Sequence, residues 1–144
     1  MDVFVVDATV VVAHLISDTF TPNARALFRE LNKTVLLHIP EFCLLECTNV
    51  LWKRVRFNNL PQAYAERLLV GLIALPMIVN QVNALLQRAL QIGLQHQLAV
   101  YDSLYIALAE SLGCPLITVD SSQETAARAV GVALKPVTDF TPQS

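Results

Sequence analysis

The stretch that decides the fold is Val3-Phe4-Val5-Val6-Asp7, together with its counterpart near the other end of the chain, Leu116-Ile117-Thr118-Val119-Asp120. Each is a short run of mostly apolar, β-forming residues closed by an aspartate. Uninterrupted runs of this kind are typical of strands that are buried on both faces of a parallel sheet. In open α/β sheets, ligands bind outside the carboxyl ends of the strands. We therefore expect the two aspartates at one acidic site, although they are far apart in the sequence.

Segments with helical spacing alternate with further short apolar runs between these two stretches. We expect strands near 3–6, 35–39, 116–119 and 132–137, an extended stretch near 76–79, and helices near 10–15, 22–31, 40–56, 61–73, 81–90, 102–112 and 121–130. Thr21 is predicted to cap the second helix, and Gly93 is a candidate break in a long fifth one. Strands separated by helices form right-handed βαβ units. The sequence thus predicts an α/β fold with a mostly parallel sheet.

The composition indicates one domain with apolar surface to spare. The chain has 144 residues, of which 54% are hydrophobic and 15% are charged. We expect a single domain over residues 1–140 and a loose tail over 141–144. The apolar surplus favours a dimer or a partner interface. A net charge of -2 neither indicates nor excludes a nucleic-acid partner, so any RNA contact has to come from local Lys and Arg residues.

The cysteines and the first residues favour a cytoplasmic protein. Cys43, Cys47 and Cys114 fit neither a disulfide framework nor zinc-ligand spacing, so we expect reduced thiols in the core. Asp2 stands where a signal peptide carries basic residues, and we expect no such peptide. The longest uncharged apolar stretch, residues 68–79, is well short of the ~18–20 residues that span a bilayer, so no membrane contact is expected.

Four acids stand out, and each also has an ordinary explanation. Asp7, Asp102 and Asp120 sit next to predicted helix starts, where an aspartate commonly caps the helix or complements its dipole. Glu46 lies mid-helix, where a solvated polar face is the ordinary interpretation. These explanations account poorly for the four together, because the predicted fold brings all four towards one edge of one sheet.

Clustered carboxylates repel one another, and some stay protonated unless a cation offsets their charge. A site built from oxygen ligands alone favours Mg²⁺ or Mn²⁺ over zinc. Because Mg²⁺ combines few carboxylates with substrate phosphate oxygens, the chemistry that fits is metal-assisted hydrolysis of a phosphodiester. We therefore predict that these four acids are the catalytic metal ligands.

Further polar residues lie close to the acids in the sequence. Glu46, Asn49 and Lys53 share one helix face, since residues three and four apart are neighbours on a helix. The hypothesis gives Asn49 the role of steering Glu46, and gives Lys53 and Arg56 the role of holding substrate phosphates. The remaining predicted supporting residues are Thr9, beside Asp7, with Ser103 and Thr118.

Four blocks of the sequence together resemble the motifs of PIN domains. In chain order they are Asp7-Ala8-Thr9, Glu46-Cys47-Thr48-Asn49, Tyr101-Asp102-Ser103-Leu104-Tyr105-Ile106-Ala107-Leu108-Ala109 and Leu116-Ile117-Thr118-Val119-Asp120. The third block is the most specific, whereas Asp-x-Thr alone is a weak signal. Over about residues 2–137, the size and motif order resemble the toxins of bacterial and archaeal VapBC-type toxin–antitoxin pairs.

The resemblance implies a three-layer α/β/α sandwich around a short parallel sheet. It implies a Mg²⁺- or Mn²⁺-dependent ribonuclease acting on single-stranded or looped RNA, with Asp7, Glu46, Asp102 and Asp120 as the metal-site acids. It also implies frequent homodimers and inhibition by a small antitoxin protein. One stretch departs from the expected pattern, because no basic residue follows Asp120 until Arg128.

Other functions remain open at this point. A response-regulator receiver shares strand-end acids and has Thr118 followed by Lys135-Pro136, but it needs an aspartate around residues 50–60, where this chain has none. A haloacid-dehalogenase-type phosphatase needs Asp-x-Asp, and here the third residue is Thr9. A catalytically quiet PIN-like module that only binds partners is the alternative from another class. Histidine catalysis is not expected, since the three histidines lie in separate segments.

Overall fold

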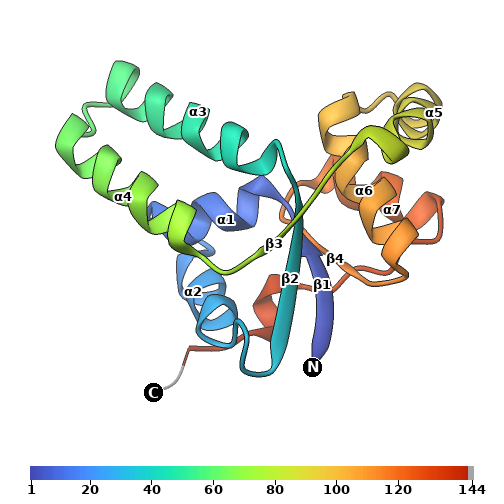
Figure 1. The fold of residues 1–144 in the computed structure, drawn as a ribbon, viewed down its shortest axis with the longest axis horizontal. Coiled ribbons are helices and arrows are strands. Elements are labelled where there is room, and N and C mark those ends of the chain that lie inside the picture. Colours follow the sequence, from blue (N-terminus) through green and yellow to red (C-terminus); the bar gives the residue numbers. More distant parts are fainter. Residues whose placement is uncertain (143–144) are drawn as a thin grey trace.

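Within residues 1–142, which the computed structural model describes, four parallel strands form one sheet in the order β3-β2-β1-β4 (Figure 1). The strands are β1 (Asp2–Val6), β2 (Val35–Pro40), β3 (Ile78–Asn80) and β4 (Leu116–Ile117). β1 is the inner strand next to β4, pairing Val5 with Leu116 on that side and with His38 of β2 on the other. The mostly parallel sheet predicted from the apolar runs is thereby confirmed.

Helices cover both faces of this sheet, giving three α/β/α layers (Figure 1). On one side lie α1 (Ala8–Leu15), α2 (Thr21–Arg29), α3 (Cys43–Phe57) and α4 (Gln62–Ala74). On the other side lie α5 (Leu86–His96), α6 (Val100–Leu112) and α7 (Ser121–Ala129). Short 3-10 turns, η1 (Asn83–Leu85) and η2 (Val137–Asp139), complete the described chain. The predicted tail over 141–144 lies partly outside the described residues.

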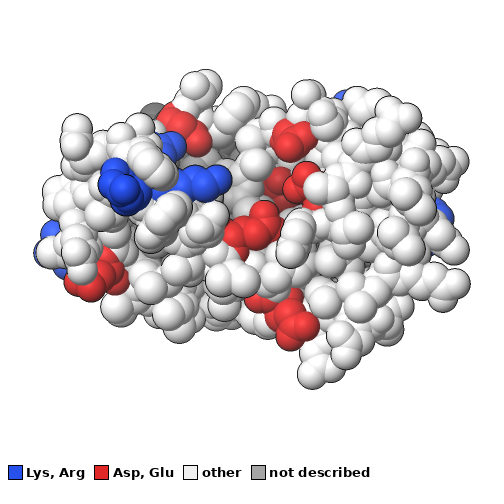
Figure 2. All heavy atoms as spheres, turned by 90° about the horizontal axis from the view of Figure 1, so that it is seen from above, with Lys and Arg blue, Asp and Glu red and all other residues white. Residues whose placement is uncertain are grey.

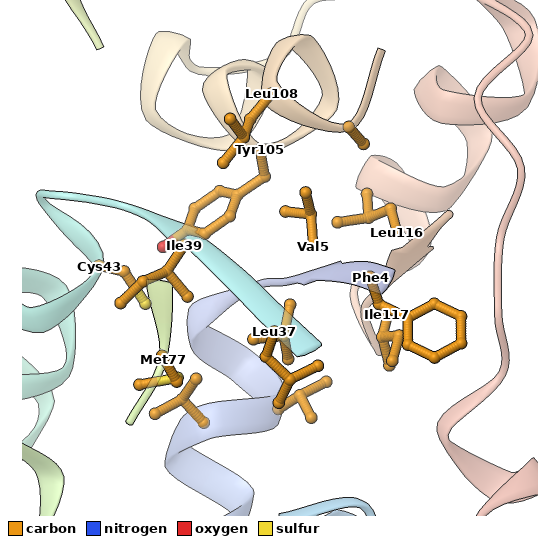
Figure 3. Close-up of a cluster of buried hydrophobic side chains, with 14 of the residues drawn as sticks. Phe4, Val5, Leu37, Ile39, Cys43, Met77, Tyr105, Leu108, Leu116 and Ile117 are labelled. Carbon is orange, nitrogen blue, oxygen red and sulfur yellow. The ribbon is translucent and has the colours of Figure 1, made fainter. Parts of the chain in front are cut away.

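The core lies where α6 packs onto the strands (Figure 3). Residues 103–109 of α6 are all buried, which explains why this helix reads as an almost continuous apolar run. The three cysteines are free and buried, as predicted. His14 also packs, because its ring stacks on Phe28 with the centroids 4.4 Å apart.

The predicted last strand, near 132–137, is wrong. This segment forms a single bridge, in which Leu116 donates to the carbonyl of Ala133 and accepts from the amide of Lys135. Pro136 follows and has no N–H to continue the pairing. The turn η2 begins at the next residue. β4 is also shorter than predicted, since it ends at Ile117, two residues early.

Two predicted helix starts are wrong because hydrogen bonds to other elements hold the residues there. Pro40 ends β2 instead of opening a helix, because the next amide, of Glu41, donates to the carbonyl of Asn80 in β3. Thr21 is the first residue of α2 and not its cap. Its hydroxyl donates to the carbonyl of Ala13 and accepts from the amide of Asp18, so it fastens α2 to α1.

Gly93 does not break a helix. α5 continues through it to His96, after the 3-10 turn η1. A Cβ at Gly93 would lie 2.6 Å from the carbonyl oxygen of Leu98, so the position needs glycine to let the loop after α5 approach. That loop leads straight into α6, so this close approach helps to fix where α6 begins.

No helix in the described part of the chain has the length and apolar character to cross a membrane.

Candidate functional site

Asp7 directly follows β1 and caps α1, and its carboxylate is buried. One oxygen accepts from the hydroxyl of Thr9 at 2.7 Å and from the amide of Val10 at 3.4 Å. The other oxygen lies 2.9 Å from the hydroxyl of Thr118, which follows β4. Burial raises the pKa of Asp7 to about 7, although each of these hydrogen bonds lowers it.

Asp120 caps α7, where its carboxylate accepts from the backbone amide of Gln123 at 3.0 Å. The amide of Asp120 in turn donates to the hydroxyl of Thr118, also at 3.0 Å. Thr118 therefore touches both Asp7 and Asp120. The two strand-end aspartates, Asp7 and Asp120, thus share contact with one hydroxyl group in the folded chain.

Glu46 lies in the first turn of α3 and is half-buried. The hydroxyl of Tyr105 donates to its Oε1 at 3.0 Å, reaching from α6 towards the start of α3 (Figure 3). Burial raises the pKa of Glu46, the Tyr105 bond lowers it, and the charge of Asp102 raises it again. The contact with Cys43 and burial raise the pKa of the Cys47 thiol, and the charges of Glu46 and Asp7 raise it further.

Asp102 lies in the first turn of α6 and is half-buried. It is not the helix cap, because α6 begins after Ala99. Burial and then the charge of Asp120 raise the pKa of Asp102. The charge of Asp102 therefore acts on Glu46, and the charge of Asp120 acts on Asp102, while the hydroxyl of Thr118 links Asp120 to Asp7.

The supporting residues fall into two groups. Thr9 and Thr118 contact Asp7 directly. Ser103 instead donates to the carbonyl of Ala99 within its own helix. Asn49 is exposed and makes no side-chain hydrogen bond within residues 1–142. The residue that bonds to Glu46 is Tyr105, and not Asn49 as predicted.

Lys53 and Arg56 are exposed on α3, beyond Glu46 along the helix. The guanidinium of Arg56 lies over the ring of Phe57, 5.4 Å from its centroid. Neither residue makes an ion pair among the residues that the structure describes. Both side chains are therefore free to meet a phosphate.

Three residues at the site were not singled out from the sequence. Tyr105 reads as one more apolar residue of a buried helix, and Gln123 reads as part of a polar helix face. Asp18 resembles a turn residue, and its carboxylate does accept from the amide of Phe20. It also lines a pocket of about 320 Å³ together with Thr9 and Glu46. Only the folded chain shows that these three face the acids.

Among residues 1–142, no basic side chain makes an ion pair with any of the four acids. The ion pairs of the described chain join Arg88 to Glu110, Arg128 to Glu124 and Lys135 to Asp139. Viewed towards the carboxyl edge of the sheet, acidic side chains gather along the middle of the molecule, while a group of Lys and Arg lies on the half that holds α3 and α4 (Figure 2). Glu124 is offset by Arg128, the first basic residue after Asp120.

The donor set fits a hard divalent cation. Like-charged carboxylates with raised pKa values and no basic partner are the arrangement that bound Mg²⁺ or Mn²⁺ relieves. In residues 1–142, no three Asp, Glu, His or Cys side chains lie close enough together to hold an ion by themselves. Mg²⁺ keeps several waters and takes one or two carboxylates directly, so the remaining acids fit as partners of metal-bound water.

Comparison with known proteins gives a consistent result. The family model described as the PIN domain matches residues 4–129. Ribonuclease VapC3 of Pyrobaculum aerophilum is 30% identical over 118 residues, covering 81% of this chain and 88% of that protein.

Three solved structures share the fold. PAE2754 of Pyrobaculum aerophilum superposes with a TM-score of 0.75 at 23% identity, covering 96% of this chain and 92% of the other. VapC20 of Mycobacterium tuberculosis, a sarcin-ricin loop cleaving toxin, gives 0.67 at 16% identity, with 90% and 96% covered. VapBC2 of Rickettsia felis, bound to a fragment of its promoter DNA, gives 0.66 at 13% identity, with 93% and 98% covered.

Proposed function

Because the chain belongs to the PIN domain family and is related to VapC ribonucleases, we propose that it is a Mg²⁺- or Mn²⁺-dependent endoribonuclease that cleaves single-stranded or looped RNA. The observation that carries the proposal is the acidic edge of the sheet. Pairwise hydrogen bonds and charge interactions link Asp7, Glu46, Asp102 and Asp120 in a series, and none of the four makes an ion pair with a basic residue among the described residues. The name of one relative and the printed activity of the M. tuberculosis neighbour support RNA as the substrate.

A divalent cation bound here supplies the charge that makes a water a better nucleophile and stabilises the leaving oxygen. The chain's own part is to hold carboxylates where the cation needs them. Asp7 is held by Thr9, with the hydroxyl of Thr118 also within hydrogen-bonding distance, and Glu46 is held by Tyr105. Because these contacts come from separate parts of the chain, the carboxylates are positioned by the fold and not by one loop.

Asp102 and Asp120 have a different kind of support, since each is placed by the start of a helix. Asp120 caps α7, and Asp102 lies in the first turn of α6. Two helix N-termini therefore point at the acidic edge. Their partial positive charges offset part of the repulsion between the carboxylates before any cation is present.

The direct test replaces Asp7 with asparagine. Asp7→Asn keeps the size of the side chain and its ability to cap α1, but removes the charge that a cation needs. We expect metal-dependent cleavage of a single-stranded RNA to fall by several orders of magnitude, with an unchanged circular dichroism spectrum. Cleavage by the variant at the wild-type rate would contradict the assignment.

Purified wild-type protein is the second arm of this test. The expected result is RNA cleavage in Mg²⁺ or Mn²⁺ that stops on addition of a chelator. A folded protein that binds neither ion and cleaves no RNA is instead the catalytically quiet binding module. Lys33→Ala is a suitable control, since Lys33 lies at the amino-terminal edge of the sheet, away from the acids.

We also propose that the chain is the toxin of a toxin–antitoxin pair and that an antitoxin helix or a second copy covers its exposed apolar surface. Between α3 and α4 lies a groove of about 430 Å³, lined by Leu51, Trp52, Ala65 and Leu69 among others. The two-component assembly of the Rickettsia felis neighbour supports a protein partner. The gene next to this one tests the idea cheaply, since a short reading frame for a DNA-binding protein is expected there.

A further inference from the structure

Gln123 is a polar side chain buried at the acidic edge, and its role is not explained by packing. It is 1% exposed in α7. Its side-chain Nε2 donates to the carbonyl of Asp102 at 3.0 Å, and its Oε1 lies 2.7 Å from the hydroxyl of Thr118. Its backbone amide donates to the carboxylate of Asp120. One residue therefore contacts Asp102, Asp120 and the threonine that lies next to Asp7.

Chemistry fixes which way the amide of Gln123 points. The carbonyl of Asp102 can only accept a hydrogen bond, so the donor Nε2 has to face it. The opposite orientation would place two oxygens against each other in a buried position, which costs the full desolvation of both. Oε1, an acceptor, is consequently left facing Thr118.

Thr118 then has one proton and two acceptors. Its hydroxyl accepts from the amide of Asp120 and lies within bonding distance of both Asp7 Oδ2, at 2.9 Å, and Gln123 Oε1, at 2.7 Å. A hydroxyl carries a single donor, so it can serve only one of them at a time. If Gln123 were apolar, that proton would be committed to Asp7, because a buried hydroxyl without an acceptor is unfavourable.

We infer that Gln123 is a positioning residue for the cation site: it anchors the backbone at Asp102 and accepts the Thr118 hydroxyl, which frees Asp7 Oδ2 to face a divalent ion. This inference rests on the proposed function, since it concerns the same acids. It assigns α7 a role beyond supplying Asp120. Residues that orient metal ligands in this way typically change metal affinity by 10–100-fold when they are replaced.

Gln123→Met tests the inference. Methionine has nearly the length of glutamine and keeps the backbone amide that caps Asp120, but it removes both side-chain hydrogen bonds. We expect the variant to bind Mn²⁺ at least about tenfold more weakly than wild type, measured by the paramagnetic resonance signal of free Mn²⁺ in a titration of the full chain. We also expect kcat for RNA cleavage to fall while KM for RNA stays within about twofold, since no RNA contact is removed.

Leu72→Ala is the matched control for lost stability. Leu72 is fully buried in α4, which carries none of the four acids. We expect it to lower the melting temperature and leave Mn²⁺ affinity unchanged. Should Gln123→Met fail to fold, Gln123→Asn is measured in its place, because its amide is one methylene too short to reach both partners.

The outcomes separate this inference from the proposal on which it rests. Weaker Mn²⁺ binding by Gln123→Met, with wild-type binding by Leu72→Ala, supports it. Equal Mn²⁺ affinity in wild type and Gln123→Met overturns it and leaves the proposed function standing. If the wild-type protein binds no Mn²⁺ and Asp7→Asn leaves RNA cleavage unchanged, both the inference and the proposed function are overturned.

Discussion

Asp7 is a buried carboxyl group whose ionisation makes the folded chain less stable. Burial raises its pKa to about 7, from an ordinary value of ~3.9. Between these two values the folded chain keeps a proton that the unfolded chain has released. The stabilisation from this proton is therefore fully present below about pH 4 and is lost as the pH rises through about 7. A shift of this size corresponds to roughly 4 kcal/mol as an upper order of magnitude.

The resulting prediction is that, with a chelator present, the wild-type melting temperature falls as the pH rises from 4.5 to 8. Asp7→Asn cannot ionise and should show a clearly smaller fall, so that at pH 8 the inactive variant is the more stable protein by several °C. Some slope should remain, because the pKa values of Glu46 and Asp102 are also raised. Identical slopes for the two proteins in thermal melts would contradict the buried carboxylate of Asp7.

Asp7, Asp120 and the two threonines that contact Asp7, Thr9 and Thr118, could be singled out from the sequence, whereas Tyr105 and Gln123 could not. Asp7 and Asp120 follow apolar runs that any reader can see, and a parallel sheet brings the ends of such runs to one edge. Tyr105 and Gln123 carry no such signal, since a tyrosine in an apolar helix and a glutamine in a polar one are ordinary. Their roles depend on the packing of α6 against α3 and α7, which local sequence does not encode.

Among the helices, α7 allows two roles of Asp120 to be tested apart, namely capping the helix and taking part in catalysis. Asp120→Asn keeps a good capping side chain, whereas Asp120→Ala removes it at a cost of about 1 kcal/mol. We expect the asparagine variant to melt like wild type and the alanine variant to melt lower. Both should lose metal-dependent RNA cleavage, because both lack the charge. An active Asp120→Asn protein would mean that Asp120 is a helix cap and nothing more.

α3 carries the predicted contacts to the RNA backbone. Lys53 lies two turns beyond Glu46 on the same face of the helix, and Arg56 follows it. On single-stranded RNA, each lost phosphate contact should lower the slope of log K against log salt by ~0.7. We therefore expect Lys53→Ala and Arg56→Ala each to bind more weakly and with a shallower slope. Lys33→Ala removes the same charge from the opposite edge of the sheet. It should change neither the RNA affinity nor the salt slope.

Element boundaries were the part of the fold that the sequence predicted least well. The start of α3 and the fate of residues 132–137 are both decided by pairing with distant segments, β3 in one case and β4 in the other. Proline misled in the first case, because it is as compatible with the end of a strand as with the first turn of a helix. The bounds of strands β1 and β2 were predicted to within one residue. Their apolar runs indicate buried strands without information from the rest of the chain.

For the molecule as a whole, the exposed apolar side chains indicate an interface. Ile73 and Leu86 are 65% and 46% exposed, and Val70 is 70% exposed, whereas Leu72 is buried. These exposed side chains of α4 and α5 are thus not covered by the core. We expect sedimentation at micromolar concentration to show a dimer, or a complex with the proposed antitoxin. Val70→Glu should weaken this association.

A control of the same kind locates that interface. Leu94 is 74% exposed on α5, on the other side of the sheet from α4. Leu94→Glu should leave assembly unchanged if α4 is the contact. A dimer that survives Val70→Glu but is lost in Leu94→Glu would move the interface to α5. A stable monomer in all three proteins would rule out self-association.

The strand order has a consequence for how the protein is made. β1 lies inside the sheet, beside a strand that is synthesised much later than β1 itself. A nascent chain can pair β1 with β2 early, but the hydroxyl of Thr118 that contacts Asp7 lies 111 residues further along the chain. The contacts among Asp7, Thr118, Asp120 and Gln123 therefore cannot form until this later segment has been made. Under the proposed function, the nascent chain would lack a complete acidic site until that point.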